Sequence, residues 1–323
     1  MQSNWQPENS QSLKTKTFKK SFDCCPRCAG KRSQVLNSRR RTDALLAFRK
    51  ASETRAKFAI PATSPISPID LAEKLGVCVR FLDAPSMEGL YRHGASPLIM
   101  LGAQRPAGRQ NFTCAHELGH HIFGHGTRVD ELNYIATYDT DEFLADMFSA
   151  FLLMPEAAVA TAFRVHEWSP TSSTPLQVYT IASTLGVAYG ALVNQMVKTL
   201  RLISTEHAYM LSRVRPKDIR AELLGSSAFE ELILADSHWT CRPIDLRIGD
   251  ILSVPIGISP LPVNLCNIGK ADTREFLQAV QPGVGQLVSE ALGWAQFVRV
   301  SRRQYTGLAR FRYLEDPDND NID

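Results

Sequence analysis

Apolar residues recur every three to four positions through much of the chain before residue 205. This spacing places them on one side of a helix, and it predicts helices over 43–58, 69–75, 108–123, 139–153 and 156–163. Ser67, Pro68 and Gly76 flank the second of these as start and stop signals. Alternating apolar and polar residues predict short strands, at 77–82, 88–93 and 97–101.

The pattern changes after residue 226, where short strand-like segments replace helical spacing. Residues 244–254 and 296–313 are rich in strand-forming side chains, and the second segment is predicted to fold back at residues 305–307. The sequence therefore predicts an α+β protein, in which a mainly helical domain with a small antiparallel sheet precedes a C-terminal α+β domain. The predicted parts are a leader (1–40), the mainly helical domain (41–221), the C-terminal domain (222–314) and an acidic tail (315–323).

Charge distinguishes the leader from the rest of the chain. The 323 residues carry a net charge of +3, but residues 1–50 contain twelve basic and three acidic side chains, so the remainder carries −6. Residues 1–40 are also polar and poor in aliphatic side chains, and we expect them to be disordered. A basic arm on an acidic body is also typical of proteins that bind nucleic acids or acidic partners, and that alternative stays open.

The cysteines indicate a reducing compartment. Seven of them are scattered along the chain, and this odd number without regular spacing does not predict a disulfide framework. One Cys-x-x-Cys pair, within 24–28, has no second pair nearby, and two ligands do not complete a structural zinc site. The chain also shows neither a secretory signal at its start nor the roughly 20 apolar residues that span a bilayer. We therefore expect a cytoplasmic protein without a membrane segment.

Residues 174–202 resemble a helix-turn-helix, with two helices around Gly186. A helix that reads DNA needs polar or basic side chains at its start. The second helix begins instead at Ala188 with mostly apolar residues, and Lys198 is its only basic residue before Arg201. The pattern favours a structural helix pair over a DNA-binding one.

The candidate chemistry centres on the motif His116-Glu117-Leu118-Gly119-His120. Residues four apart lie on one face of a helix, so His116 and His120 can present two imidazoles to one metal ion. Glu117 is rotated by roughly 100° from His116, where it can act on the attacking water without binding the metal. This arrangement is the physical basis of the His-Glu-x-x-His zinc peptidase motif.

A catalytic zinc ion needs a third protein ligand. Candidate side chains follow the motif at His121, His125, Asp130, Glu131, Asp139, Asp141, Glu142 and Asp146. Rotation around the helix directs His121 away from the site, and the glycines beside His125 predict that the helix ends before it. Glu142 lies on the next amphipathic helix and is the strongest candidate. Asp146, one turn later, can accept the N–H of a ligand histidine.

Residues 112–121 and 142–155 resemble the ImmA/IrrE family of metallopeptidases, and the similarity extends over roughly 42–205. The resemblance implies an intracellular protease that cleaves a helix-turn-helix repressor. Such cleavage would activate stress-response or mobile-element genes. The leader and the segment after residue 226 fall outside the resemblance, so it implies nothing about their roles.

Carried over residue by residue, the resemblance implies zinc ligands at His116, His120 and Glu142 and a catalytic role for Glu117. Many members of the family have Asn where this chain has Asp146. An aspartate can accept the histidine N–H at least as well as an asparagine, so this departure leaves the predicted metal site unchanged.

Two parts of the mechanism stay open at this point. The oxyanion of a tetrahedral intermediate needs a hydrogen-bond donor, and Tyr134, Tyr138 and His93 are available. An extended substrate would pair with an edge strand, for which residues 88–93 are a candidate.

Other functions compete with the zinc peptidase. The chain could be a sensor in which zinc only holds helices together, or a DNA-associated regulator that uses residues 1–50 and 174–202. Glu117 favours the peptidase, because a structural metal site has no use for that carboxylate. For residues 222–314, a regulatory or docking role and a packing role are equally compatible with the sequence.

Overall fold

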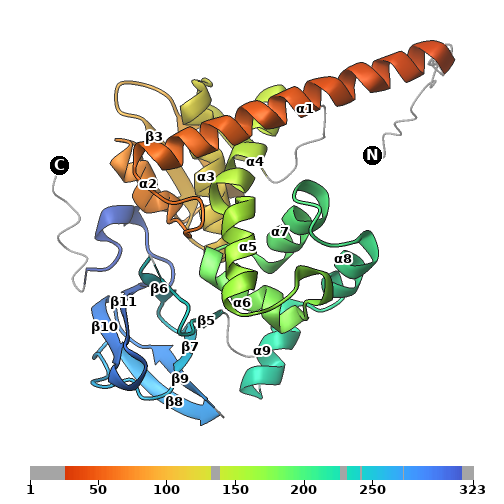
Figure 1. The fold of residues 1–323 in the computed structure, drawn as a ribbon. Coiled ribbons are helices and arrows are strands. Elements are labelled where there is room, and N and C mark those ends of the chain that lie inside the picture. The colour runs from red at the N-terminus through yellow and green to blue at the C-terminus, as the bar shows by residue number, and fades with distance from the viewer. Residues whose placement is uncertain (1–25, 132–138, 226–230, 241, 272, 315–323) are drawn as a thin grey trace, which may run out of the picture. The chain divides into compact units, whose positions relative to one another are not determined.

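The computed structural model describes residues 26–131, 139–225, 231–240, 242–271 and 273–314, with the backbone alone described for 26–37 and 128–131. The chain divides into two compact units, Met1–Arg41 and Thr42–Asp323. Apart from the start of helix α1, all that follows concerns the second unit (Figure 1).

Helix α1 spans Pro26–Lys57. The sequence predicts a helix only from residue 43 and disorder up to residue 40, so the helix in the structure begins earlier and residues 26–40 are helical. Apart from one glycine, this segment is built mainly from Arg, Lys, Gln, Leu and Ser, several of which are good helix formers. The predicted Cys-x-x-Cys pair lies outside the described side chains.

A mixed five-stranded sheet lies beside the helices. Its order is β12-β1-β3-β2-β4. Its strands are β1 (Cys78–Leu82), β2 (Met87–Arg92), β3 (Leu98–Gly102), β4 (Arg128–Glu131) and β12 (Gly307–Leu308). The sequence predicts a small antiparallel sheet, but β1 and β3 are parallel neighbours. Strand β2, which connects β1 to β3 in sequence, does not lie between them in the sheet. It lies on the other side of β3 and pairs antiparallel with both β3 and β4.

The expectation that residues 88–93 form an edge strand is wrong. Strand β2 has a hydrogen-bonded neighbour on each side, β3 and β4. Strand β4 follows the helix that carries His116 and His120, and no local pattern in the sequence predicts that it pairs with β2. Among the described strands, β4 and β12 are the ends of the sheet.

The predicted helices after α1 are confirmed, with bounds that shift by one or two residues, and the structure adds two helices between residues 205 and 224 that the sequence does not predict. After α1 the helices are α2 (Pro68–Lys74), α3 (Ala107–Phe123), α4 (Thr140–Leu153), α5 (Glu156–Val165), α6 (Pro175–Leu185), α7 (Tyr189–Asn194), a π-helical turn (Gln195–Thr199), α8 (Thr205–Ser212) and α9 (Pro216–Leu224). Helix α3 packs against β2 and β3 and also against α4. Fully buried Leu118 on α3 and Phe148 on α4 belong to the same hydrophobic core as Ile99 on β3.

Helices α4 and α5 together form an apolar stretch, Thr140–Val165, that is long enough to cross a membrane by length and composition. Within the fold, 61% of its most apolar window is buried. Packing in the core therefore accounts for its hydrophobicity.

The helix pair predicted at 174–202 is present as α6, α7 and the π-helical turn. Thr174 and Gln177 form a capping box at the start of α6, and Gly186 ends it with a positive φ of 69°. One face of the second helix packs into the core, where Leu192 and Met196 are fully buried. Its exposed face carries Gly190, Asn194 and Lys198, so a single basic side chain is available there for contacts with DNA phosphates.

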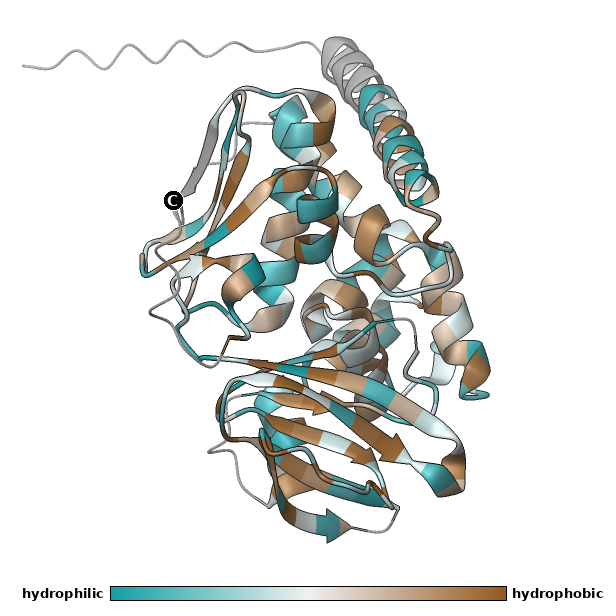
Figure 2. Ribbon diagram, turned by 90° about the vertical axis from the view of Figure 1, so that its left-hand side faces the viewer, coloured by the Kyte–Doolittle hydropathy of each residue, from teal (hydrophilic) through white to brown (hydrophobic). Residues whose placement is uncertain are grey.

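The C-terminal region contains two further sheets with the orders β10-β11-β6 and β5-β7-β9-β8. Their strands are β5 (Leu232–Leu234), β6 (Ile244–Arg247), β7 (Ile251–Pro255), β8 (Leu265–Ala271), β9 (Arg274–Ala279), β10 (Gly283–Ser289) and β11 (Trp294–Ser301). A second hydrophobic core lies here around Trp239, and Figure 2 shows the apolar residues along these strands. The α+β fold class is confirmed.

The chain returns from this region to the first sheet. The sequence predicts that residues 296–313 fold back on themselves, but β12 pairs antiparallel with β1 instead of β11. Ala309, just after β12, is fully buried in the main core. The boundary at residue 222 stays a prediction. Strand β12 lies within the predicted C-terminal domain in sequence, but it pairs with the first sheet in the structure.

An ion-pair network also connects the C-terminal strands to the helical part of the chain. Arg299 on β11 donates two hydrogen bonds to Asp245 on β6, at 2.6 and 2.8 Å, and a third at 3.0 Å to Asp70 on α2. The Tyr313 hydroxyl also donates to Asp245, at 2.7 Å. Burial would raise the pKa of Asp245, but the hydrogen bonds and positive charge of Arg299 outweigh it and lower that pKa.

This network predicts an acid-sensitive contribution to stability. Because the folded-state pKa of Asp245 is depressed, its contribution is present above the unfolded pKa of about 3.9 and is lost as pH falls through the folded value. Asp245→Asn should lower the free energy of unfolding at pH 7 by about 2 kcal/mol or more. Urea unfolding of both proteins between pH 7 and pH 3 should show this difference shrinking below about pH 4, and a pH-independent difference would contradict the assignment.

Candidate metal centre

The two motif histidines lie on one face of α3. The helix begins after Pro106 and ends at Gly124, whose left-handed backbone (φ 71°) stops it one turn after His120. His116 and His120 are buried, with 7% and 0% of their surface exposed, and their ring centroids are 4.8 Å apart. The motif therefore forms the predicted pair of imidazoles.

Close packing of α3 against α4 brings the third candidate to this pair. A Cβ atom on Gly119 would lie only 3.0 Å from the Ala145 Cα atom, so a larger residue would push the helices apart. Ala145 is one turn after Glu142, which lies in the first turn of α4, and Asp139 caps that helix by accepting from the Asp141 amide. The glycine within the motif thus sets the distance at which Glu142 meets the histidines.

The three donor atoms form a compact triangle. His116 Nε2 and His120 Nε2 are 3.1 Å apart, and the Glu142 carboxylate oxygens lie 3.2 Å from the first and 3.6 Å from the second. A tetrahedral ion with ligands at 2.0–2.1 Å requires about 3.3 Å between neighbouring donors. His116, His120 and Glu142 are within metal-binding distance of one another and fit a metal ion.

Asp146 lies beside the first of the two histidines. Its Oδ1 atom is 2.9 Å from His116 Nδ1, which directs the Nε2 lone pair of His116 towards the triangle. Burial would lower the pKa of His116, but the hydrogen bonds with Asp146 and Glu142 raise it to about 10. Hydrogen bonds from His116 and His120 in turn lower the pKa of Glu142. The site therefore favours a cation between its three donors, either a proton or a metal ion.

Sequence reasoning assigned no role to His125. His120 Nδ1 lies 2.9 Å from His125 Nδ1, and His125 Nε2 lies 3.4 Å from an Asp141 oxygen. The sharp end of α3 causes this, because Gly124 turns the chain back and the His125 amide bonds to the His120 carbonyl at 2.9 Å. The sequence carries a signal for this contact, because Gly124 ends the helix directly before His125. From the sequence alone, that glycine serves only to exclude His125 as a metal ligand.

The other candidates lie elsewhere. His121 points away from the metal triangle, as predicted, and its Nδ1 is 2.9 Å from the Tyr91 hydroxyl on β2. That hydroxyl also lies 3.4 Å from His93 Nδ1, so His93 belongs to a separate cluster. The side chains of Asp130, Glu131, Tyr134 and Tyr138 lie outside those that the structure describes.

Glu117 is fully buried and lies against strand β2. A Cβ atom on Gly89 would overlap the Glu117 Oε1 atom and come within 2.5 Å of Thr113 Cγ2. The glycine therefore leaves the space in which the Glu117 carboxylate sits. Glu117 is next in sequence to His116, and its charge acts on that imidazole, but it is not one of the three donors.

Residues 72–196 match the family model of the IrrE N-terminal-like domain, Peptidase_M78. The match supports the resemblance of this segment to the ImmA/IrrE family. It contains α3 and α4, and hence all three donors as well as Glu117, Asp146 and His125. No curated protein matches the chain in sequence. The ImmA/IrrE match suggests a metallopeptidase, which is consistent with the three donors. The match ends before α8 and the C-terminal sheets.

The contact with His125 predicts a specific effect on metal affinity. His125→Ala removes the partner of His120 Nδ1 and should weaken Zn²⁺ binding by about 10- to 100-fold, the usual range for such supporting side chains. His121→Ala, one residue from His120 but directed at Tyr91, is the matched control and should change affinity little. Competition with a fluorescent zinc chelator measures both, and equal effects of the two substitutions would show that His125 does not support the site.

Proposed function

We propose that the chain is a cytoplasmic zinc metalloendopeptidase. The proposal rests on the convergence of the His116 and His120 imidazoles with the Glu142 carboxylate. A further carboxylate, that of buried Glu117, follows His116 in the same helix. Three protein ligands of the types His, His and Glu are typical of catalytic zinc sites, whereas structural sites are closed by four protein ligands. Glu117 gives the site an acid–base group that metal binding alone does not require.

The residues divide the chemistry between them. Zinc, when bound, would polarise the scissile carbonyl and lower the pKa of the attacking water. Glu117 would take the proton of that water and pass it to the leaving amine. Asp146 and His125 would hold His116 and His120 in the tautomers that leave their Nε2 atoms free to bind the metal.

We propose a helix-turn-helix transcriptional repressor as the substrate, as the family resemblance implies. Its cleavage would activate stress-response or mobile-element genes. An extended segment of such a protein could add to the edge of a sheet. Among the described strands that edge is β4, which follows α3 directly and lies beside β2 and Gly89.

Substitution of Glu117 separates catalysis from metal binding. Glu117→Gln keeps the shape of the side chain but removes the base, so zinc content should be unchanged while cleavage falls by about 10²- to 10⁴-fold. The substrates are a peptide library and purified helix-turn-helix repressors of the source organism, and mass spectrometry detects the products. Exposed Glu222→Gln serves as the matched control.

The outcomes distinguish the competing functions. Cleavage that survives in Glu117→Gln would show that Glu117 has another role. A zinc-loaded wild-type protein that cleaves neither probe would favour the sensor without catalysis. DNA binding that persists after removal of zinc and weakens with salt would favour the DNA-associated regulator.

The position of Gly89 makes a second prediction about the same step. Gly89→Ala places a methyl group against Glu117 Oε1, so the carboxylate must move and peptidase activity should fall by at least about 10-fold, because small displacements of catalytic groups are costly. Zinc affinity should stay within about threefold. Gly190→Ala, whose added Cβ would meet nothing within 4 Å, is the control. Full activity in Gly89→Ala would mean that the carboxylate does not act from this position.

A further inference from the structure

A cavity of about 410 Å³ lies in the second unit, apart from the metal centre. Its walls come from the first turn of α3, the turn between α6 and α7, helix α9, strands β5 and β6, and the segment after β11. The described residues that line it include none of the three metal-binding candidates. Its volume is within the range of pockets that hold small organic molecules.

The lining is strongly basic. Seven arginines line the cavity against three carboxylates, those of Glu231, Asp245 and Asp250. Arg299 already binds Asp245 through two hydrogen bonds. Arg242 donates to the main-chain carbonyls of Ser183 and Thr184, and its guanidinium lies 4.9 Å from the centre of the Trp239 ring. Arg109 and Arg312 pair with Glu88 and Asp70, which lie outside the lining, and the other arginines of the lining still outnumber its carboxylates.

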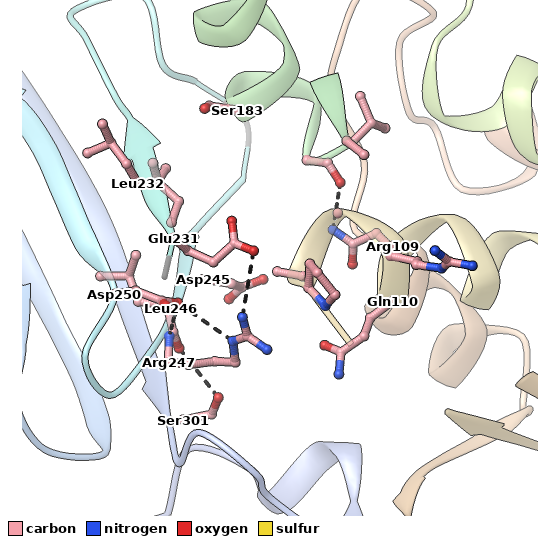
Figure 3. A pocket seen from close by; sticks show the side chains of 18 of the residues that line it. Arg109, Gln110, Ser183, Glu231, Leu232, Asp245, Leu246, Arg247, Asp250 and Ser301 are labelled. Carbon is pink, nitrogen blue, oxygen red and sulfur yellow. Dashed lines mark hydrogen bonds and ion pairs between the residues drawn. The ribbon is translucent and has the colours of Figure 1, made fainter. Parts of the chain in front are cut away.

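Several buried polar atoms in this lining have no hydrogen-bond partner among the described residues. They are Arg220 Nε, Arg247 Nε and Asp250 Oδ1. Arg247 is anchored through Nη1 to the Arg105 carbonyl at 2.9 Å, but it approaches the carboxylates of Asp250 and Glu231 only to 3.7 and 3.9 Å. Figure 3 shows Arg247 between these two acids.

Asp250 is 1% exposed, and its Oδ2 atom accepts from the Arg247 amide at 2.8 Å. Its other oxygen is left as an acceptor in the same lining. Buried polar atoms without partners are costly, so two guanidinium donors and one acceptor around one cavity indicate a polar ligand that satisfies them.

Apolar and aromatic side chains complete the cavity. Phe81, Val187 and Tyr189 line it and are themselves largely buried. A free inorganic anion would leave this apolar surface uncovered. The mixture instead suits a molecule with an organic body and one anionic group.

We propose that this cavity binds a small organic anion. Arg220 and Arg247 would hold its phosphate or carboxylate group, and the ligand would donate a hydrogen bond to Asp250. The site is independent of the proposed peptidase activity. The ligand would lie against Pro106–Gln110 at the start of α3, the helix that carries His116 and His120, and against the C-terminal strands at the same time.

Calorimetric titration of the purified full-length chain at constant ionic strength tests the proposal. The probes are AMP, which carries a phosphate and an amino donor, the dicarboxylate amino acid glutamate, and inorganic phosphate. We expect one organic probe to bind with 1:1 stoichiometry and a Kd below about 1 mM. A preference for AMP or for glutamate identifies the anionic group, and equal binding of inorganic phosphate would overturn the requirement for an organic body.

Variants locate the binding to the cavity. Arg220→Gln and Asp250→Asn should each weaken the binding by about 10-fold or more, as expected for loss of a charge-assisted hydrogen bond. Exposed Arg164→Gln should stay within twofold. Hydrogen exchange of the wild type should show protection by the ligand at 106–111 and 242–250, and this readout does not depend on how well any variant folds. Absence of binding by both organic probes, or binding with neither protection there nor any loss in the variants, overturns the proposal.

Discussion

The close packing of α3 against α4 is the contact on which the metal centre depends. Neither helix can bind a metal by itself, because α3 supplies two donors and a catalytic zinc needs a third. Gly119 lets the Ala145 backbone approach, and this approach brings Glu142 to within 3.2 and 3.6 Å of the two imidazoles. The glycine inside the motif is therefore as much a part of the site as the side chains around it.

The two histidines are oriented in different ways. His116 faces the exposed carboxylate of Asp146 directly, whereas His120 faces a second imidazole, that of His125, which in turn faces Asp141. Direct contact with a carboxylate favours the protonated form of His116 strongly, as its raised pKa shows. The His125 ring lies between His120 and Asp141 and fixes the orientation of the His120 ring through Nδ1. The Nδ1 atoms of the two rings thus have partners of different chemistry, while both Nε2 atoms face Glu142.

The C-terminal region is joined to the helical part by more than its connection in sequence. Strand β12 extends the first sheet through β1, Arg299 ties α2 to β6, and the basic cavity is lined from both regions. The same segment extends the first sheet and lines a cavity beside the start of α3. A packing role and a regulatory role both stay predictions for it, and this geometry is compatible with either.

The sequence alone predicted most of the helices and the pair of imidazoles, because helical spacing and capping are local properties. It predicted Glu142 and Asp146 through amphipathic spacing and family resemblance, and the structure places both beside the histidines. The role of His125, the loss of the β2 edge to β4, the parallel pairing of β1 with β3 and the return of β12 were decided only by the tertiary structure. The last three depend on which distant segments meet, through strand pairings that no local pattern encodes, whereas His125 is placed by the end of α3 at Gly124.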